Sequence, residues 1–142
     1  MQAPAAQIMG VTGGATTMSA RPAKMMSFMD SVKTCIQKYA GFEGRASRSE
    51  YWWFFLAYNI ILIPVGIVDG LVFGVELSDP TWFTWGLQLA LILPWAAVSA
   101  RRMHDHGKSG WFILIPFYNL YLLIIEGEAM PNTYGAVPTN KL

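Results

Sequence analysis

The sequence predicts an all-α integral membrane protein in which an amphipathic interfacial helix precedes three transmembrane helices. Three observations predict this class. Hydrophobic residues make up 54% of the 142 residues and charged residues only 13%, which is about half the charged share of a soluble domain. The hydrophobic residues gather in three long runs, and Lys and Arg stand beside these runs. A soluble domain of this size could not bury so much apolar surface, so we do not expect a soluble enzyme.

The charge balance and the cysteine content exclude several other classes. The chain has 10 Lys and Arg residues against 9 Asp and Glu residues. It therefore lacks the basic excess of nucleic-acid binding proteins, and we expect no nucleic-acid partner. Cys35 is the only cysteine, so an intramolecular disulfide is excluded and no CxxC pair is present for zinc or redox chemistry.

The N-terminal part divides into a tail and a helix. Residues 1–23 are rich in Ala, Gly, Thr and Met and have no carboxylate, so we expect an extended tail without a packed core. From residue 24 to 40 apolar residues recur every three or four positions, with lysines on the opposite face. This pattern predicts an amphipathic helix. Its position just before a membrane span favours an interfacial helix over a soluble core helix.

Residues 41–138 form the predicted membrane domain, followed by a short C-terminal end, 139–142. The expected spans are 51–73, 81–100 and 111–125. The first has 23 residues, roughly 34 Å of helix, enough for a hydrocarbon layer of about 30 Å. The third has only 15 residues, roughly 22 Å. It crosses only if the bilayer thins or flanking residues are included, and the alternative is a re-entrant segment.

The distribution of Lys and Arg predicts the orientation of the spans. Basic residues lie before the first span and between the second and third, whereas the first connection carries only Glu76 and Asp79. We therefore expect a multi-pass membrane protein with a cytoplasmic N-terminus. A crossing third run would place the C-terminal segment outside. The basic residues that carry this argument are Lys33, Lys38, Arg45, Arg48, Arg101, Arg102 and Lys108.

Four sequence elements occur in order along residues 39–138. They are a GFEGRASRSEYWW segment from Gly41, an LP pair at Leu93, an RRMHD segment from Arg101 leading to SGW, and a closing N-x-YG-x-x-P from Asn132. At these residues the chain resembles the domain of unknown function 805 family of bacterial membrane proteins. The resemblance implies a small multi-span protein of a bacterial inner membrane, or of an organellar membrane derived from one. It implies no established reaction.

Charged residues of two of these elements are expected to converge on the inner interface. One interpretation is a lipid-headgroup site, because arginines can fork a phosphate and a structural phospholipid would bind there. The other is an ion-pair network that holds the segment before the first span against the second connection. The candidate residues for both are Arg45, Arg48, Glu50, Arg101, Arg102, Asp105 and Lys108.

Other polar residues predict structure more than chemistry. Adjacent His104, Asp105 and His106 cannot easily face one ion, so we expect no metal site and no cofactor. Ser109 is expected to be an N-cap and not a nucleophile, which leaves no catalytic residue. The list of polar residues expected inside the spans comprises Asn59 and Gln88, which could bond across helices, and Asp69, which should reach water at the outer end.

The expected function is that of a non-catalytic accessory or structural subunit of a larger membrane complex, which contacts membrane lipids and other membrane proteins. Three short spans bury little area by themselves, which favours partner helices. Two alternatives stay open. A transporter or channel component would need a polar stripe through the spans. A membrane enzyme acting on lipids would use His104 and Asp105 as acid or base.

Overall fold

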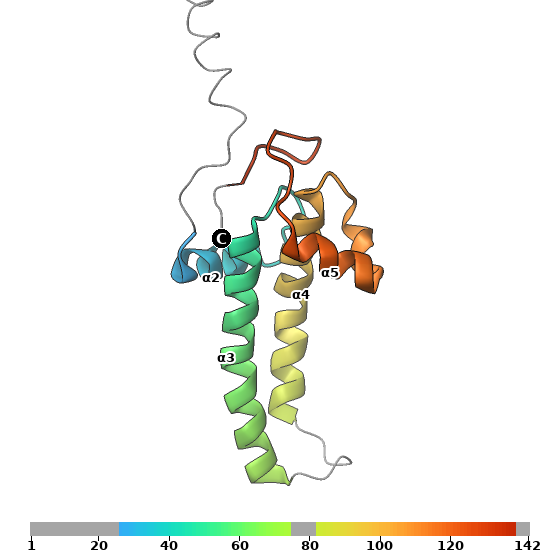
Figure 1. Cartoon of the computed structure of the whole chain (residues 1–142). Helices are drawn as coiled ribbons and strands as arrows, with labels where there is room; N and C mark the ends of the chain where they lie inside the picture. The colour runs from blue at the N-terminus through green and yellow to red at the C-terminus, as the bar shows by residue number, and fades with distance from the viewer. Residues whose placement is uncertain (1–25, 75–81, 139–142) are drawn as a thin grey trace, which may run out of the picture.

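The computed structural model describes residues 26–74 and 82–138, and within these ranges the regular structure is helical (Figure 1). The expected all-α class is therefore confirmed. The predicted tail, the C-terminal end and Asp79 lie outside the described residues. The elements in chain order are α2 (Phe28–Gln37), α3 (Arg48–Phe73), α4 (Trp82–His104), the 3-10 helix η1 (Gly110–Leu114) and α5 (Pro116–Ile124).

Two long helices, α3 and α4, lie side by side as an antiparallel pair (Figure 1). They contain 26 and 23 residues, roughly 39 and 34 Å of helix. Both are long and apolar enough to cross a membrane. They correspond to the first two predicted spans. Ser47 starts α3 by accepting a hydrogen bond from the Glu50 N–H at 3.1 Å, and α3 ends at Gly74, whose φ is 107°.

The expected third span, 111–125, is not a single membrane-crossing helix. The extended residue Ile115 and Pro116 divide it into η1, with 5 residues, and α5, with 9 residues. A 9-residue helix is only about 14 Å long, less than half of the hydrocarbon layer. The following segment also returns to the end of α4 where η1 begins, since the Glu128 N–H donates to the Asp105 carbonyl at 2.8 Å. The described part of the chain thus has two candidate spans.

Helix α2 is shorter than the predicted 24–40 and lies across the pair near the start of α3 (Figure 1). Ser27 caps it, because its hydroxyl oxygen accepts from the Asp30 N–H at 3.1 Å. Part of the apolar face turns inward: Cys35 is buried, and the Phe28 ring meets Trp53 of α3 edge to face with ring centres 5.8 Å apart, whereas Met29 and Ile36 stay exposed. Helix α2 therefore packs against the α3–α4 pair and is not an isolated surface helix.

A tyrosine after α2 donates a hydrogen bond to a main-chain carbonyl of α4 that lacks its helical partner. Pro94 lies inside α4 and has no N–H, so the carbonyl of Ala90, four residues earlier, loses its helical partner. The hydroxyl of Tyr39 donates a hydrogen bond to this carbonyl. The contact explains how the proline is tolerated within a helix that is apolar enough to cross a membrane.

Replacing Tyr39 with Phe is therefore expected to destabilise the protein by about 1–3 kcal/mol, because it leaves a carbonyl without a partner. Unfolding in detergent measures the change. Tyr121→Phe is the matched control, since Tyr121 is 56% exposed. In a Pro94→Ala background the new N–H can bind the Ala90 carbonyl, so the cost of Tyr39→Phe should fall. An equal cost in both backgrounds would contradict this role of Tyr39.

Asp69 does not reach water, contrary to the expectation for the outer end of the first span. Its side chain is 1% exposed. Its carboxylate accepts a hydrogen bond from the Thr84 N–H at 2.9 Å, and Thr84 is the third residue of α4. The N–H groups of a first helical turn have no partner within the helix. Asp69 of α3 thus caps α4 from the neighbouring helix.

Candidate functional site

A cluster of five charged side chains lies where the segment before α3 meets the end of α4. The members are Arg45, Glu50, Arg101, Arg102 and Asp105. None is more than 6% exposed. The Ala46 N–H donates to the Arg101 carbonyl at 2.9 Å and joins the two segments directly. We call this set the buried charge cluster.

Asp105 is shared by two arginines. Its Oδ1 accepts from Arg45 Nε at 3.0 Å and from Arg45 Nη2 at 2.8 Å. Its Oδ2 accepts from Arg102 Nη1. The Asp105 side chain and the Arg102 side chain are fully buried, and that of Arg45 is 1% exposed. Such charges are stable inside a protein only when they are paired and hydrogen-bonded.

A third ion pair joins the two long helices. Glu50, in the first turn of α3, accepts a hydrogen bond from Arg101 Nη1, in the last turn of α4. Cys35 of α2 lies on the same carboxylate, with its Sγ 3.9 Å from Glu50 Oε1. The positions also suit the helix dipoles, which favour an acid at a helix N-terminus and a base at a C-terminus. Glu50 therefore connects α2, α3 and α4.

Main-chain carbonyls of the C-terminal segment accept further hydrogen bonds from the arginines. The cluster has three arginines and two carboxylates, a net charge of 3 − 2 = +1. Arg45 donates to the carbonyls of Glu128 and of Met130, the latter at 2.7 Å, and Arg102 donates to the carbonyl of Ile125. These contacts hold the segment after α5 against the cluster. Because the acceptors are main-chain carbonyls, these contacts do not require particular side chains in the segment after α5.

A tight turn at 132–135 closes this end of the molecule. Asn132 and Gly135 form an isolated antiparallel bridge, and Asn132 Nδ2 donates to the His104 carbonyl at 2.9 Å. The Tyr134 ring stacks on the His104 imidazole, with ring centres 4.0 Å apart and planes 4° apart. Gly135 has φ 132°, which favours glycine. The closing motif of the sequence thus covers the end of α4.

The His104, Asp105 and His106 side chains diverge. His104 Nδ1 bonds the Gly44 carbonyl at 3.1 Å, and His106 Nε2 bonds the Leu122 carbonyl at 2.7 Å. Asp105 is held between its arginines. No group of three His, Cys, Asp or Glu side chains within residues 26–74 and 82–138 is placed to hold a metal ion.

Four of the predicted site residues lie outside the cluster. Arg48 is more exposed, and its Nη1 is 3.4 Å from the Ile124 carbonyl. Lys108 is exposed. Asn59 donates to the Phe55 carbonyl of its own helix at 2.7 Å. Gln88 is half-buried and has no hydrogen-bond partner among the described residues, so the structure shows no bond between these two amides.

Two contributions were missed by reasoning from the sequence. One is the set of main-chain carbonyls after α5. Every residue type has such a carbonyl, so no sequence pattern indicates which ones bind the arginines. The other is Cys35, whose spacing marked only an apolar helix face. Asn132 and Tyr134 belong to the closing motif of the sequence. The motif therefore marked these residues, but it did not indicate that they contact His104.

Burial, and after it the neighbouring Glu50 carboxylate, raise the pKa of the Cys35 thiol from 9.0 to about 12. Because the thiolate is the reactive form, labelling at pH 8 should be on the order of 1,000-fold slower than for an ordinary thiol. The folded state keeps the proton that the unfolded state loses above pH 9, so stability should fall between pH 9 and 12. Maleimide labelling in detergent, with a denatured sample as control, measures the first effect. Equal rates in both samples would contradict the burial of the thiol.

Comparison with known proteins finds relatives that are inner membrane proteins. The inner membrane protein YhaH of Escherichia coli is 32% identical over 117 residues, which cover 78% of this chain and 97% of YhaH. The inner membrane protein YhaI of the same organism is 36% identical over 110 residues, which cover 72% of this chain and 90% of YhaI. No solved structure matches the chain.

The family model described as "Protein of unknown function (DUF805)" matches residues 39–136. These residues include the buried charge cluster, both candidate spans and the closing turn. The relatives are inner membrane proteins, and the described part of this chain has two helices long and apolar enough to cross a membrane. The chain belongs to the DUF805 family of membrane proteins.

Proposed function

We propose that this protein is a non-catalytic accessory subunit that binds another membrane protein through the α3–α4 pair. In this proposal the pair crosses a bacterial inner membrane with the N-terminus in the cytoplasm, and α2 lies in the inner interface. The surface of the pair supports it. In the most apolar stretch of α3 only 11% of residues are buried inside the chain, and in α4 only 28%. Most of the helix surface is therefore available to lipid or to other helices.

The observation that carries the proposal is the Gln88 amide. It belongs to an apolar part of α4, and no described residue offers it a hydrogen bond. Lipid chains cannot satisfy an amide, whereas polar side chains of a neighbouring helix can, for about 0.6–2 kcal/mol. Gly86 lies two residues before Gln88 and therefore on the opposite side of α4, and a side-chain atom built on it would meet nothing within 4 Å. The Gly86 side of α4 is thus open to another helix independently of the Gln88 side.

The buried charge cluster supports a structural role and not catalysis. Asp105 is fully buried between two arginines, and the Glu50 side chain is 5% exposed against Arg101. A general acid or base must reach its substrate within hydrogen-bond distance. Neither carboxylate is accessible to a lipid in this arrangement. In our proposal the cluster fixes the angle between the spans and the elements at the inner interface.

Anionic phospholipid is a second ligand in this proposal, but at different residues from the arginines of the cluster. Arg45, Arg101 and Arg102 are engaged inside the protein. Arg48 and Lys108 are the predicted basic residues that reach the surface. Each such residue gains about 1 kcal/mol near an anionic membrane surface. A transport role is less supported, because Asn59 and Asp69 are bonded to main-chain groups of the pair.

A photo-crosslinking amino acid at Leu89, which is 67% exposed, tests the proposed helix partner in intact cells. We expect one discrete adduct with a membrane protein that mass spectrometry identifies. Gln88→Leu should remove the adduct, whereas Asn59→Leu, which removes an amide already bonded to its own helix, should leave it. Lipid adducts alone, together with a monomer at every protein concentration in mild detergent, would contradict the proposal.

A further inference from the structure

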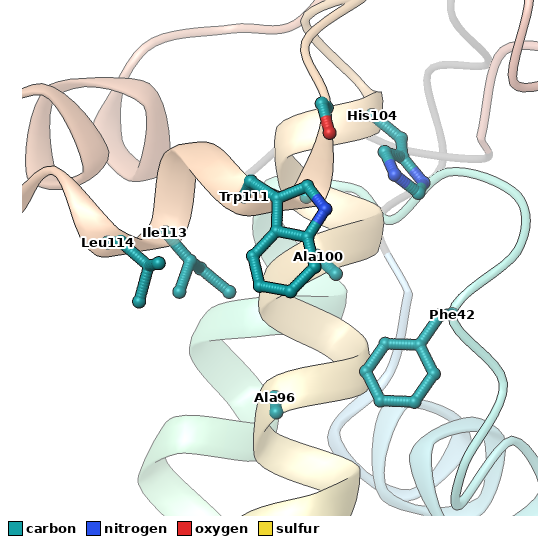
Figure 2. A pocket seen from close by; sticks show the side chains of 9 residues that line it. Phe42, Ala96, Ala100, His104, Trp111, Ile113 and Leu114 are labelled. Atoms are coloured by element: carbon teal, nitrogen blue, oxygen red, sulfur yellow. The ribbon is translucent and has the colours of Figure 1, made fainter.

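A groove of about 390 Å³ lies beside the buried charge cluster, and none of the five side chains of the cluster lines it. One face of α4 forms its floor, because Ala96, Ala100 and His104 follow each other at intervals of four residues. Figure 2 shows Phe42 on one side of this face and Trp111 on the other. Ile113 and Leu114 of η1 extend the wall beyond Trp111. The two alanines leave the space that larger side chains would fill.

One end of the groove is polar. His104 Nδ1 bonds the Gly44 carbonyl, and because a carbonyl only accepts, Nδ1 carries the hydrogen and Nε2 of the neutral ring is an acceptor. Nε2 faces the groove, since a side-chain atom built on Gly110 would lie 3.6 Å from it. Tyr134 stacks on the ring and fixes it. The Ser109 hydroxyl, expected to cap η1, makes no capping bond and also lines the groove.

The other end is apolar and open. Trp111 is 78% exposed, Leu114 71% and Phe42 42%. The floor is part of α4, one of the two candidate spans, and the groove lies at the end of α4 that carries its arginines. Indole rings with one exposed edge are typical of the membrane interface. If Trp111 lies at the headgroup level, the groove runs from there along Ala100 and Ala96 of the candidate span, where the upper part of an acyl chain would lie.

We propose that this groove binds diacylglycerol, with part of one acyl chain along Ala96 and Ala100 and the free glycerol hydroxyl at His104 and Ser109. The volume falls within the range of small-molecule sites, about 300–1,000 Å³. His104 Nε2 can accept the hydrogen of a hydroxyl group. None of the nine lining residues is Lys, Arg, Asp or Glu, so a charged headgroup gains no counter-ion there. The assignment is independent of a helix partner at Gln88.

Photolabelling of the full-length protein in phosphatidylethanolamine and phosphatidylglycerol vesicles tests this assignment. A trace of diacylglycerol carries a diazirine in one acyl chain, and peptide mapping locates the adducts. Phosphatidylglycerol and phosphatidylethanolamine with the same labelled chain are the comparison probes. Ala96→Phe fills the groove from a half-buried position, and Leu89→Phe adds the same ring at an exposed position of α4 outside it.

We expect the diacylglycerol probe to label residues 96–114 preferentially. Ala96→Phe should lower this labelling about tenfold or more, because its ring takes the space of several acyl methylenes, and Leu89→Phe should not. Ser109→Ala should reduce the preference for diacylglycerol over the comparison probes. This variant and the probe comparison keep the test valid if Ala96→Phe fails to fold. Labelling spread evenly along α3 and α4, or a groove labelled equally by all three probes, would overturn the proposal.

Discussion

Asp105→Asn is expected to destabilise the protein by about 3–5 kcal/mol, because it leaves two buried guanidinium groups without their shared carboxylate. Arg45 and Arg102 both depend on Asp105. An asparagine keeps the shape and one acceptor oxygen but no charge, so the penalty of the buried positive charge remains. A loss of this size is comparable to the whole stability of many small proteins. We therefore expect low abundance in the membrane and a much lower midpoint of unfolding in detergent.

The control for this substitution is Glu126→Gln, which neutralises an exposed carboxylate after α5. Exposed charges contribute about 0–1 kcal/mol, so this change should be nearly silent. The arginines should also release the carbonyls of the C-terminal segment in Asp105→Asn, which would increase proteolysis after residue 125. An Asp105→Asn protein as stable as the Glu126→Gln protein would show that the cluster is not formed.

Glu50→Gln is expected to have the second largest effect, also about 3–5 kcal/mol, because the fully buried Arg101 loses its carboxylate. Glu50 also accepts from Cys35, so the contact of α2 with the long helices should weaken. In the substituted protein the Cys35 thiol should react faster with maleimide. The unfolding midpoint and the labelling rate, measured on the same sample, report the two consequences.

A double substitution separates the loss of a pair from the exposure of one charge. Removing both members of a buried ion pair is often nearly neutral when apolar side chains of similar volume replace them. Glu50→Leu combined with Arg101→Met should therefore be much more stable than Glu50→Gln alone. If the double variant is as unstable as the sum of its single variants, the two side chains act independently and the pair is not formed.

The hairpin of α3 and α4 could be predicted because hydrophobic length and flanking charge are local properties of a sequence. The convergence of Arg45 and Asp105 could also be predicted, since two antiparallel spans bring residues 41–50 and 101–108 to one end. Which arginine pairs with which carboxylate depends on packing, and the sequence left it open between lipid and protein partners. The structure joins Arg45 and Arg102 to Asp105, and Arg101 to Glu50.

The run 111–125 shows why hydrophobicity alone was insufficient to predict a third membrane-crossing helix. Its composition resembles that of a span, but Pro116 begins a new helix and the preceding residues form a 3-10 turn. Arg45 and Arg102 then bind carbonyls on its far side. These contacts join residues 23 to 85 positions apart, so no local pattern reveals them. The same is true of Tyr39, whose partner is a carbonyl made free by Pro94.

The side of the membrane on which residue 126 lies tests the account most directly. Single cysteines at Glu43, Glu76 and Glu126, each in a Cys35→Ala background, can be labelled with an impermeant maleimide in membrane vesicles of known orientation. We predict that positions 43 and 126 react from the same side and position 76 from the opposite side, because the cluster holds the C-terminal segment beside Arg45. Reaction of position 126 from the same side as position 76 would mean that 111–125 crosses, and would contradict the cluster.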